Sequence, residues 1–190
     1  MITPGNVIAA LWLVWLLGWL LAAAWTASTV AEQSVGARLA HSVFIWAGAA
    51  LLFMRGDSGI LLSAIIPRAS WISWLGVALV ATGLGFAGWA RMHLGRLWSG
   101  SVTLREGHAI VQTGPYGMAR HPIYTGLLLA LIGTVLTHGT VAALAGFLLI
   151  LVGVILKIRQ EESLMLEHFG ADYQAYRRNV PALIPRLPGP

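Results

Sequence analysis

Apolar residues gather in five long segments of this chain, and polar links separate them. These segments cover residues 7–27, 39–54, 71–90, 123–136 and 141–156. The first and the third have about the 20 residues that a helix needs to cross a bilayer. The last two are shorter, and the turn at 137–140 joins them, which predicts a helical hairpin with both ends on one side of the membrane. We therefore predict an all-α integral membrane protein with about five transmembrane helices.

Two other parts of the chain contain apolar residues without matching a span. Residues 60–66 are too few to cross a bilayer and are followed by Pro67, so we expect a surface or re-entrant piece there. Residues 157–178 are mostly polar and directly follow the last apolar segment. We predict a C-terminal amphipathic helix over them, and Pro181 and Pro185 prevent its continuation.

The composition supports the membrane interpretation. Hydrophobic residues make up 57% of the 190 positions and charged residues only 10%, which is too apolar for a soluble domain of this size. The absence of cysteine excludes disulfides, thiolate zinc sites and cysteine nucleophiles. The net charge of +5 could indicate a nucleic-acid partner, but basic residues cluster at the ends of the apolar segments, so we expect none. No basic residue precedes the first segment, so a cleaved signal peptide is not expected.

The basic residues are distributed unequally between the two sides that five spans would define. One side holds Arg55 and Arg68, and the other holds the remaining ten. These ten are Arg38, Arg91, Arg96, Arg105, Arg120, Lys157, Arg159, Arg177, Arg178 and Arg186. Since cytoplasmic loops of membrane proteins are enriched in Lys and Arg, we predict a cytoplasmic C-terminus and an N-terminus outside.

The most conspicuous polar interval of the chain covers residues 107–126 and ends in the sequence RHPIYTG. Pro122 suits the first turn of a helix, which would begin at the cytoplasmic boundary and run into the membrane. The free N–H groups of that helix start, together with Arg120, favour an anionic ligand. Tyr116 and Tyr124 add flat rings and hydroxyl groups. The alternative is a proline-started helix whose arginine reaches the lipid headgroups.

A second polar cluster follows the hairpin, from Lys157 through Arg159 to Glu161 and Glu162. On a helix, the two carboxylates flank an apolar stripe that includes Ile158, so both point partly toward the packed side. Two acids there could bind an amine, ribose hydroxyls or a cationic centre. The alternative is a set of surface ion pairs of little energetic value. Ionisable residues at a membrane boundary tend to be functional, which favours a site.

Two patterns that could indicate other chemistry are better explained otherwise. Residues 83–88 match Gly-x-Gly-x-x-Gly, but a dinucleotide fingerprint needs a preceding strand, and this one lies inside an apolar segment. Close helix packing explains it better. The six histidines form no metal-ligand pair at helical spacing, so a metal site is unsupported.

Several motifs in order resemble the isoprenylcysteine carboxyl methyltransferase family, which is grouped with the phospholipid methyltransferases. They are GHAIVQTGPY at 107–116, RHPIYTG at 120–126, the pair Glu161–Glu162, and FGADYQAY at 169–176. The resemblance covers about residues 94–185. It divides the chain into transmembrane helices at 1–92 and a catalytic half at 93–190, which would comprise a cofactor-binding loop, the hairpin and the C-terminal helix.

The resemblance implies a membrane methyltransferase that uses S-adenosylmethionine and takes a lipophilic substrate from the bilayer. The cofactor would contact His108, Ala109, Ile110, Val111, Tyr116, His121, Pro122, Ile123, Tyr124 and Glu161. The catalytic assignment covers Arg120, Lys157, Arg159 and Glu162, and family members use one basic residue before the acidic pair to place the substrate. Both Lys157 and Arg159 qualify. The short chain is typical of a prokaryotic member in the cytoplasmic membrane.

Two other functions are compatible with parts of the sequence. Membrane reductases that act on sterols with NADPH carry a similar C-terminal pattern, although they are usually larger. A non-catalytic scaffold would leave the paired acids unexplained. Within the methyltransferase hypothesis the acceptor stays open among a prenylated cysteine carboxylate, a phospholipid amine and a small thiol, and so does the oligomeric state.

Overall fold

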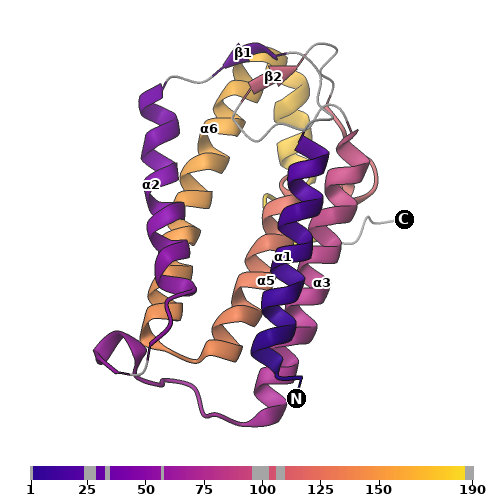
Figure 1. Ribbon diagram of the computed structural model, residues 1–190. Coiled ribbons are helices and arrows are strands. Elements are labelled where there is room, and N and C mark those ends of the chain that lie inside the picture. The colour runs from indigo at the N-terminus through magenta and orange to yellow at the C-terminus, as the bar shows by residue number, and fades with distance from the viewer. Residues whose placement is uncertain are drawn as a thin grey trace.

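The computed structural model consists almost entirely of helices (Figure 1), which confirms the predicted all-α membrane fold. It describes residues 2–23, 29–32, 35–56, 58–95, 103–105 and 110–186. The α-helices are α1 (Pro4–Ala23), α2 (Val35–Leu52), α3 (Ser70–Leu94), α4 (Pro115–Met118), α5 (Pro122–His138) and α6 (Val141–Asn179). The sequence did not predict the short antiparallel pair of β1 (Thr29–Glu32) and β2 (Thr103–Arg105), which links two polar connections.

Three of the described helices are long and apolar enough to cross a membrane, namely α1, α3 and α6. Two shorter apolar helices lie beside them, at Leu39–Leu52 and Pro122–His138. The chain is therefore a multi-pass membrane protein, and the count of five spans stays a prediction. In Figure 1, α1, α3 and α5 form one group of helices, and α2 lies along α6 in a second group.

Glycines bring α3 and α5 into close contact. A Cβ atom built on Gly83 would lie 2.4 Å from the carbonyl oxygen of Gly126 and 2.6 Å from the amide nitrogen of Ala130. A Cβ atom on Gly85 would meet no atom within 4 Å. Within the Gly-x-Gly-x-x-Gly pattern, Gly83 thus serves helix packing, as predicted, whereas a Cβ atom on Gly85 or Gly88 would meet no neighbour.

Glycines also bring α2 and α6 into close contact. A Cβ atom on Gly146 of α6 would lie 2.4 Å from the amide nitrogen of Leu52, and one on Gly153 would lie 2.9 Å from the carbonyl oxygen of His41. Gly139 has a different task, because its φ of 64° ends α5 in the left-handed conformation. The pairing of α3 with α5 and of α2 with α6 joins both predicted parts of the chain, and their division at residue 92 stays a prediction.

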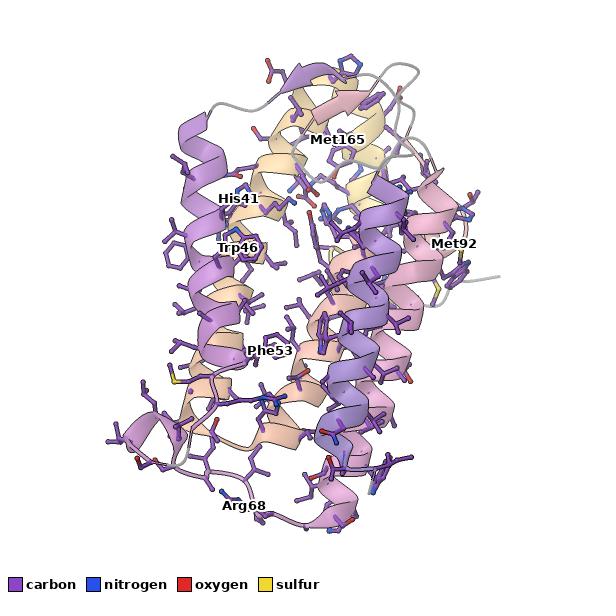
Figure 2. All side chains as sticks on the ribbon, in the orientation of Figure 1. His41, Trp46, Phe53, Arg68, Met92 and Met165 are labelled. Atoms are coloured by element: carbon purple, nitrogen blue, oxygen red, sulfur yellow. The ribbon has the colours of Figure 1, made fainter. Side chains whose placement is uncertain are left out.

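Apolar side chains between the two helix groups form the core. The largest buried cluster includes Leu52, Leu131, Ile150 and Val154, and Trp12 of α1 packs against it. The Nε1–H group of Trp12 donates to Oγ1 of Thr134 across 3.0 Å, which satisfies both polar groups inside the apolar region. Figure 2 shows Phe53 pointing into this region from the end of α2, whereas Trp46 points outward from the same helix and is 74% exposed.

The chain around η1 (Ile60–Leu62) closes the end of the molecule at which α5 meets α6. The amide nitrogen of Ile65 donates to the carbonyl oxygen of Gly139 across 2.7 Å, and Ala64 forms a β-bridge with Thr140. The segment does not cross the bundle, in agreement with the expected surface piece. The candidate site lies at the other end of α5.

The second hairpin helix continues directly into the polar tail, and the label α6 covers both over 39 residues. Oγ1 of Thr140 caps its start by accepting from the amide of Ala143. Gly170 interrupts the helical conformation with φ 51° and ψ −118°. The residues from Lys157 to Glu162 thus lie before this kink, on the direct extension of an apolar helix, which fixes their orientation relative to α5.

Candidate active site

The start of α5 forms one wall of the site. Pro122 is the first residue of the helix, as predicted, and His121 is its N-cap with an extended φ of −122°. The amides of Arg120 and His121 donate to the carbonyl oxygens of Pro181 and Ala182 across 2.8 and 3.0 Å. These two N–H groups are therefore engaged by the chain itself, and the anionic ligand expected at this helix start stays a prediction.

Glu162 is the buried member of the acidic pair, with 11% of its side chain exposed. Its Oε1 atom accepts from Nε and Nη2 of Arg120 across 2.9 and 2.7 Å, which is a bidentate contact through one oxygen. Its Oε2 atom lies 3.3 Å from Nε of Arg177. Nη1 of Arg120 also donates to the carbonyl oxygens of Arg177 and Val180. Glu162 therefore joins α5, α6 and the end of the chain.

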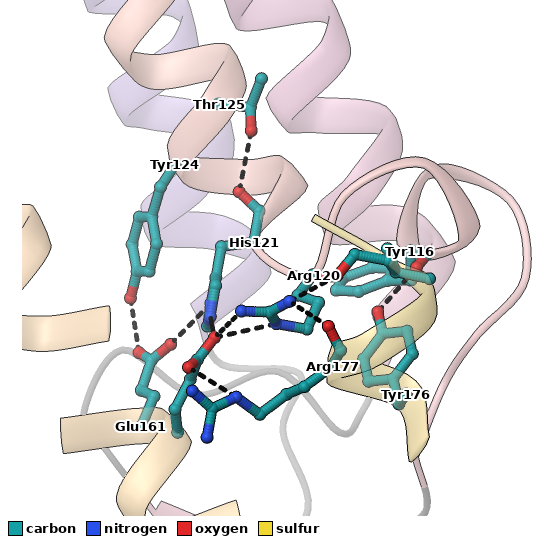
Figure 3. Close-up of polar contacts among 10 residues, drawn as sticks. Tyr116, Arg120, His121, Tyr124, Thr125, Glu161, Tyr176 and Arg177 are labelled. Carbon is teal, nitrogen blue, oxygen red and sulfur yellow. Dashed lines mark hydrogen bonds and ion pairs between the residues drawn. The ribbon is translucent and has the colours of Figure 1, made fainter. Parts of the chain in front are cut away.

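His121 lies between the two carboxylates, and Figure 3 shows its ring beside Glu161. Its Nδ1 atom is 3.4 Å from Oε2 of Glu161, and its Nε2 atom is 3.2 Å from Oε1 of Glu162. The ring is buried and stacks on Tyr124, with centroids 5.8 Å apart and an interplanar angle of 22°. A protonated imidazole donates to both acids at once, which holds them in fixed positions.

Glu161 is the more accessible acid, with 24% of its side chain exposed. Its Oε1 atom accepts from the hydroxyl of Tyr124 across 2.5 Å. Nζ of Lys157 lies 5.7 Å from the ring centroid of Tyr124, on the same side of α6 as Glu161. Arg159 is exposed. Of the two basic residues that the sequence left open, Lys157 is thus the one directed toward the site.

The charges in this cluster determine its protonation. Burial alone would raise the pKa of the Glu162 carboxyl, but hydrogen bonds from His121 and Arg120 outweigh it and lower this pKa to about 2. Burial also opposes the charged form of Glu161, yet its bond to His121 and the charge of Lys157 lower the pKa of Glu161. Burial alone would lower the pKa of His121, whereas the two carboxylates raise it above 6.5. These shifts favour two carboxylates around an imidazolium.

These shifts define the pH range in which the contacts stabilise the fold. The Glu162 contacts contribute fully above the ordinary pKa of 4.5 and are lost as the pH falls through about 2. The contacts of protonated His121 contribute fully below 6.5 and are lost as the pH rises through its raised pKa. Between about pH 4.5 and 6.5 both sets are complete.

Tyr116 borders the site from α4. Its ring is buried and stacks on His93, with centroids 6.4 Å apart, and its carbonyl oxygen accepts from the hydroxyl of Tyr176 across 2.6 Å. Nε2 of His93 lies 2.9 Å from Oγ1 of Thr113. Burial, together with the charge of Glu161, raises the pKa of Tyr116, so its hydroxyl stays neutral. The stacked rings of Tyr116 and His93 therefore lie beside Thr113, just before α4.

The structure brings most of the predicted residues together. Arg120, His121, Tyr124, Glu161 and Glu162 form a connected set of contacts with Lys157 beside it. Tyr116 contacts His93 and Tyr176. Pro122 is buried, and Ile110, Val111 and Ile123 are half-buried. The predicted contacts His108 and Ala109 lie outside the described residues. Among the described residues, no group of three or more His, Asp or Glu side chains could hold a metal ion.

Sequence reasoning missed three residues that complete the cluster, namely His93, Tyr176 and Arg177. His93 lies on the last turn of α3. Tyr176 and Arg177 lie after the kink at Gly170, which redirects the end of α6 toward α5. The tail motif contained Tyr176, but no local pattern indicated that the chain turns back at Gly170.

Comparison with known proteins places this cluster within a family. Residues 71–172, more than half of the chain, match the family model described as phospholipid methyltransferase. The chain belongs to this family. The matched residues include α5 and the part of α6 that carries the two acids.

Individual relatives extend this result. The chain is 32% identical over 137 residues to the nickel-cobalt-cadmium resistance protein NccN of Alcaligenes xylosoxydans xylosoxydans, covering 68% of this chain and 61% of that protein. It is 30% identical over 118 residues to protein-S-isoprenylcysteine O-methyltransferase B of Arabidopsis thaliana, covering 60% of each chain. The resemblance to isoprenylcysteine carboxyl methyltransferases is thereby confirmed, and the chain spans about 60% of the length of these relatives.

A solved structure shares the fold. The eukaryotic intramembrane Ras methyltransferase ICMT superposes with a TM-score of 0.52 and 23% sequence identity, over 82% of this chain and 54% of the other. The match supports the arrangement of membrane helices. The family found here is one of methyltransferases, so it gives no support to the reductase alternative.

Proposed function

We propose that this protein is a membrane methyltransferase that uses S-adenosylmethionine, with its site between the start of α5 and the extension of α6. The observation that carries the proposal is the half-buried carboxylate of Glu161, which Tyr124 and His121 hold at the end of the apolar helices. An ionised acid retained at a membrane boundary, within the segment that matches a methyltransferase family, indicates a ligand-binding role.

The residues present fit this cofactor. S-adenosylmethionine carries an ammonium group and ribose hydroxyls, and the carboxylate of Glu161, the more exposed acid, is a suitable acceptor for either. Its positive sulfonium and its adenine suit aromatic surroundings, such as the rings of Tyr124, His121 and Tyr116. When bound, it supplies an electrophilic methyl group on a positively charged sulfur. The protein's part is to hold donor and acceptor in line, which can contribute about 7–11 kcal/mol.

We propose that the methyl acceptor is an anionic group on a lipophilic molecule. Among the three acceptors left open, we favour a carboxylate over an amine or a thiol. Lys157 supports this choice, because its ammonium group lies over the ring of Tyr124 at the boundary of the apolar part of α6. It can hold a carboxylate beside the site while the apolar remainder of the substrate stays in the bilayer. A carboxylate is already deprotonated at neutral pH, so this chain need not provide a general base.

The proposal also assigns a side of the membrane. The excess of Lys and Arg at the end of the molecule that carries the site supports a cytoplasmic location for it, with the N-terminus outside. The cytoplasm supplies S-adenosylmethionine, and a lipophilic substrate reaches the same boundary from within the bilayer. In this arrangement a prokaryotic cytoplasmic membrane would present both substrates to one site.

A methyl-transfer assay with paired variants tests the function and the role of Lys157 together. Purified protein in lipid is incubated with methyl-labelled S-adenosylmethionine and a membrane lipid extract, and labelled lipids are separated and identified. We expect wild type to label a lipophilic acid as a base-labile ester. Lys157→Met is expected to lower the rate at limiting acceptor by about 10-fold, since a charged hydrogen bond contributes about 1.5–3 kcal/mol.

Arg159→Met is the matched comparison, because it removes the same charge from an exposed position two residues away on the same helix. We expect it to stay within about twofold of wild type, as for most surface substitutions. No labelled lipid with wild type would contradict the proposed activity. Equal losses in both variants, or a loss in Arg159→Met alone, would contradict the role of Lys157.

A further inference from the structure

Both oxygens of Glu162 are engaged by the protein itself. An ionised carboxylate has about four acceptor sites. Four N–H groups contact this carboxylate, namely Nε and Nη2 of Arg120, Nε2 of His121 and Nε of Arg177. With 11% of its side chain exposed, Glu162 has little surface left for a ligand, whereas its neighbour Glu161 has 24%.

Residues 180–186, which we call the C-terminal segment, are bound to the start of α5 through hydrogen bonds from Arg120 and its neighbours. Nη1 of Arg120 donates to the carbonyl oxygen of Val180, and the amides of Arg120 and His121 donate to Pro181 and Ala182. Further along, Oγ1 of Thr125 donates to the carbonyl oxygen of Leu183 across 2.6 Å. The C-terminal segment thus follows α5 over the stretch that carries His121 and Tyr124.

We propose that Glu162 is a positioning residue and not a ligand for the cofactor. Through Arg120 it fixes the C-terminal segment on the start of α5, and through His121 it holds Glu161 in the orientation that binds the cofactor. This inference rests on the proposed function, because Glu162 would position the residue that binds the cofactor. It separates two adjacent acids into one that contacts the ligand and one that does not.

The charges around His121 determine how this arrangement responds to pH. Glu161 faces Nδ1 of this ring and Glu162 faces Nε2. Arg120 and Arg177 contact Glu162 as well. The hydroxyl of Tyr124 donates to Glu161, and the ammonium group of Lys157 lies over the ring of Tyr124. A protonated His121 donates to both carboxylates, whereas a neutral ring can donate from one nitrogen only. Cofactor affinity should therefore fall as the pH rises through the pKa of His121.

Glu162→Gln tests the inference through this pH dependence. The amide keeps the shape of the side chain but removes the negative charge beside Nε2, so His121 deprotonates at lower pH. We expect the pH midpoint for binding of S-adenosylhomocysteine, measured by calorimetry in lipid, to move down by about 1 unit. Well below that midpoint, the variant should bind within about threefold of wild type, because Glu161 still holds the ligand.

Two further variants keep the test decisive. Glu167→Gln, an exposed acid on the same helix, should leave the midpoint unchanged. Arg177→Met removes a cation instead of an anion from the surroundings of Glu162, and its side chain is 40% exposed, so the fold should tolerate it. Its midpoint should stay or rise. A lower pH midpoint in Arg177→Met, or an equal loss of affinity at every pH in Glu162→Gln, would overturn the positioning role.

A second readout does not depend on the cofactor. In protein labelled with ¹⁵N-histidine, the ring signals of His121 are assigned by their loss in His121→Asn, and their titration is followed in wild type and in Glu162→Gln. We expect the His121 titration to shift to lower pH in the variant, and an unshifted titration would contradict the inference. If the His121 titration shifts in Glu162→Gln but the wild-type protein binds no S-adenosylhomocysteine, the proposed function is refuted and the positioning of His121 by Glu162 remains supported.

Discussion

Glu161→Gln is expected to lower the affinity for S-adenosylhomocysteine by about 10- to 100-fold, the largest effect of any single substitution in the site. Glu161 is the more exposed of the two acids, and Tyr124 and His121 already hold it in place. The amide retains the size of the side chain and one acceptor oxygen but loses the charge that attracts a cationic ligand. Calorimetric titration of the variant in lipid measures this loss.

The matched control for Glu161→Gln is again Glu167→Gln, which removes the same charge from an exposed position of α6. Both proteins must show the same helix content by circular dichroism and the same elution from a sizing column. Undiminished binding in the Glu161 variant would refute the assignment of the ligand-binding acid. A similar loss in both variants would show that overall charge, and not the site, controls binding.

Gly83→Ala is expected to cause the largest loss of stability. Its Cβ atom would lie 2.4 Å from the carbonyl oxygen of Gly126, which is backbone and cannot rotate away, so α3 and α5 must separate. Overpacking of this kind costs about 1–3 kcal/mol. Thermal unfolding in detergent should show a Tm several degrees below that of wild type.

Gly85→Ala, two residues along the same helix, provides the control, because a Cβ atom there meets no atom within 4 Å. Alanine favours a helix over glycine by about 1 kcal/mol. The control should therefore unfold at or above the temperature of wild type. A Tm for Gly83→Ala equal to that of Gly85→Ala would contradict the close approach of α3 and α5.

Local patterns in the sequence predicted those features that depend on local physics. The apolar segments predicted the helices, since a membrane helix must be apolar along its length. Pro122 predicted the start of α5, because proline suits the first turn and His121 before it avoids the helical region. The position of Glu161 and Glu162 beside the apolar stripe predicted that they turn inward, although only Glu162 is buried.

Contacts between residues far apart in the chain could not be predicted from local sequence patterns. Nothing near Arg177 indicates that it meets Glu162, because their contact requires the positive φ of Gly170. No local pattern indicated either that the carbonyl groups of Pro181 and Ala182 bind the amides of Arg120 and His121. The choice between Lys157 and Arg159 required knowledge of which side of α6 faces Tyr124.

The central claim is that Glu161 and its neighbours form a binding site for S-adenosylmethionine, and calorimetric titration of the wild-type protein in lipid nanodiscs tests it most directly. S-adenosylhomocysteine and NADPH are titrated separately into the same preparation, whose helix content is checked before and after. The account predicts saturable binding of one S-adenosylhomocysteine per chain and no binding of NADPH. A folded protein that binds no S-adenosylhomocysteine, or that binds NADPH in its place, would contradict it.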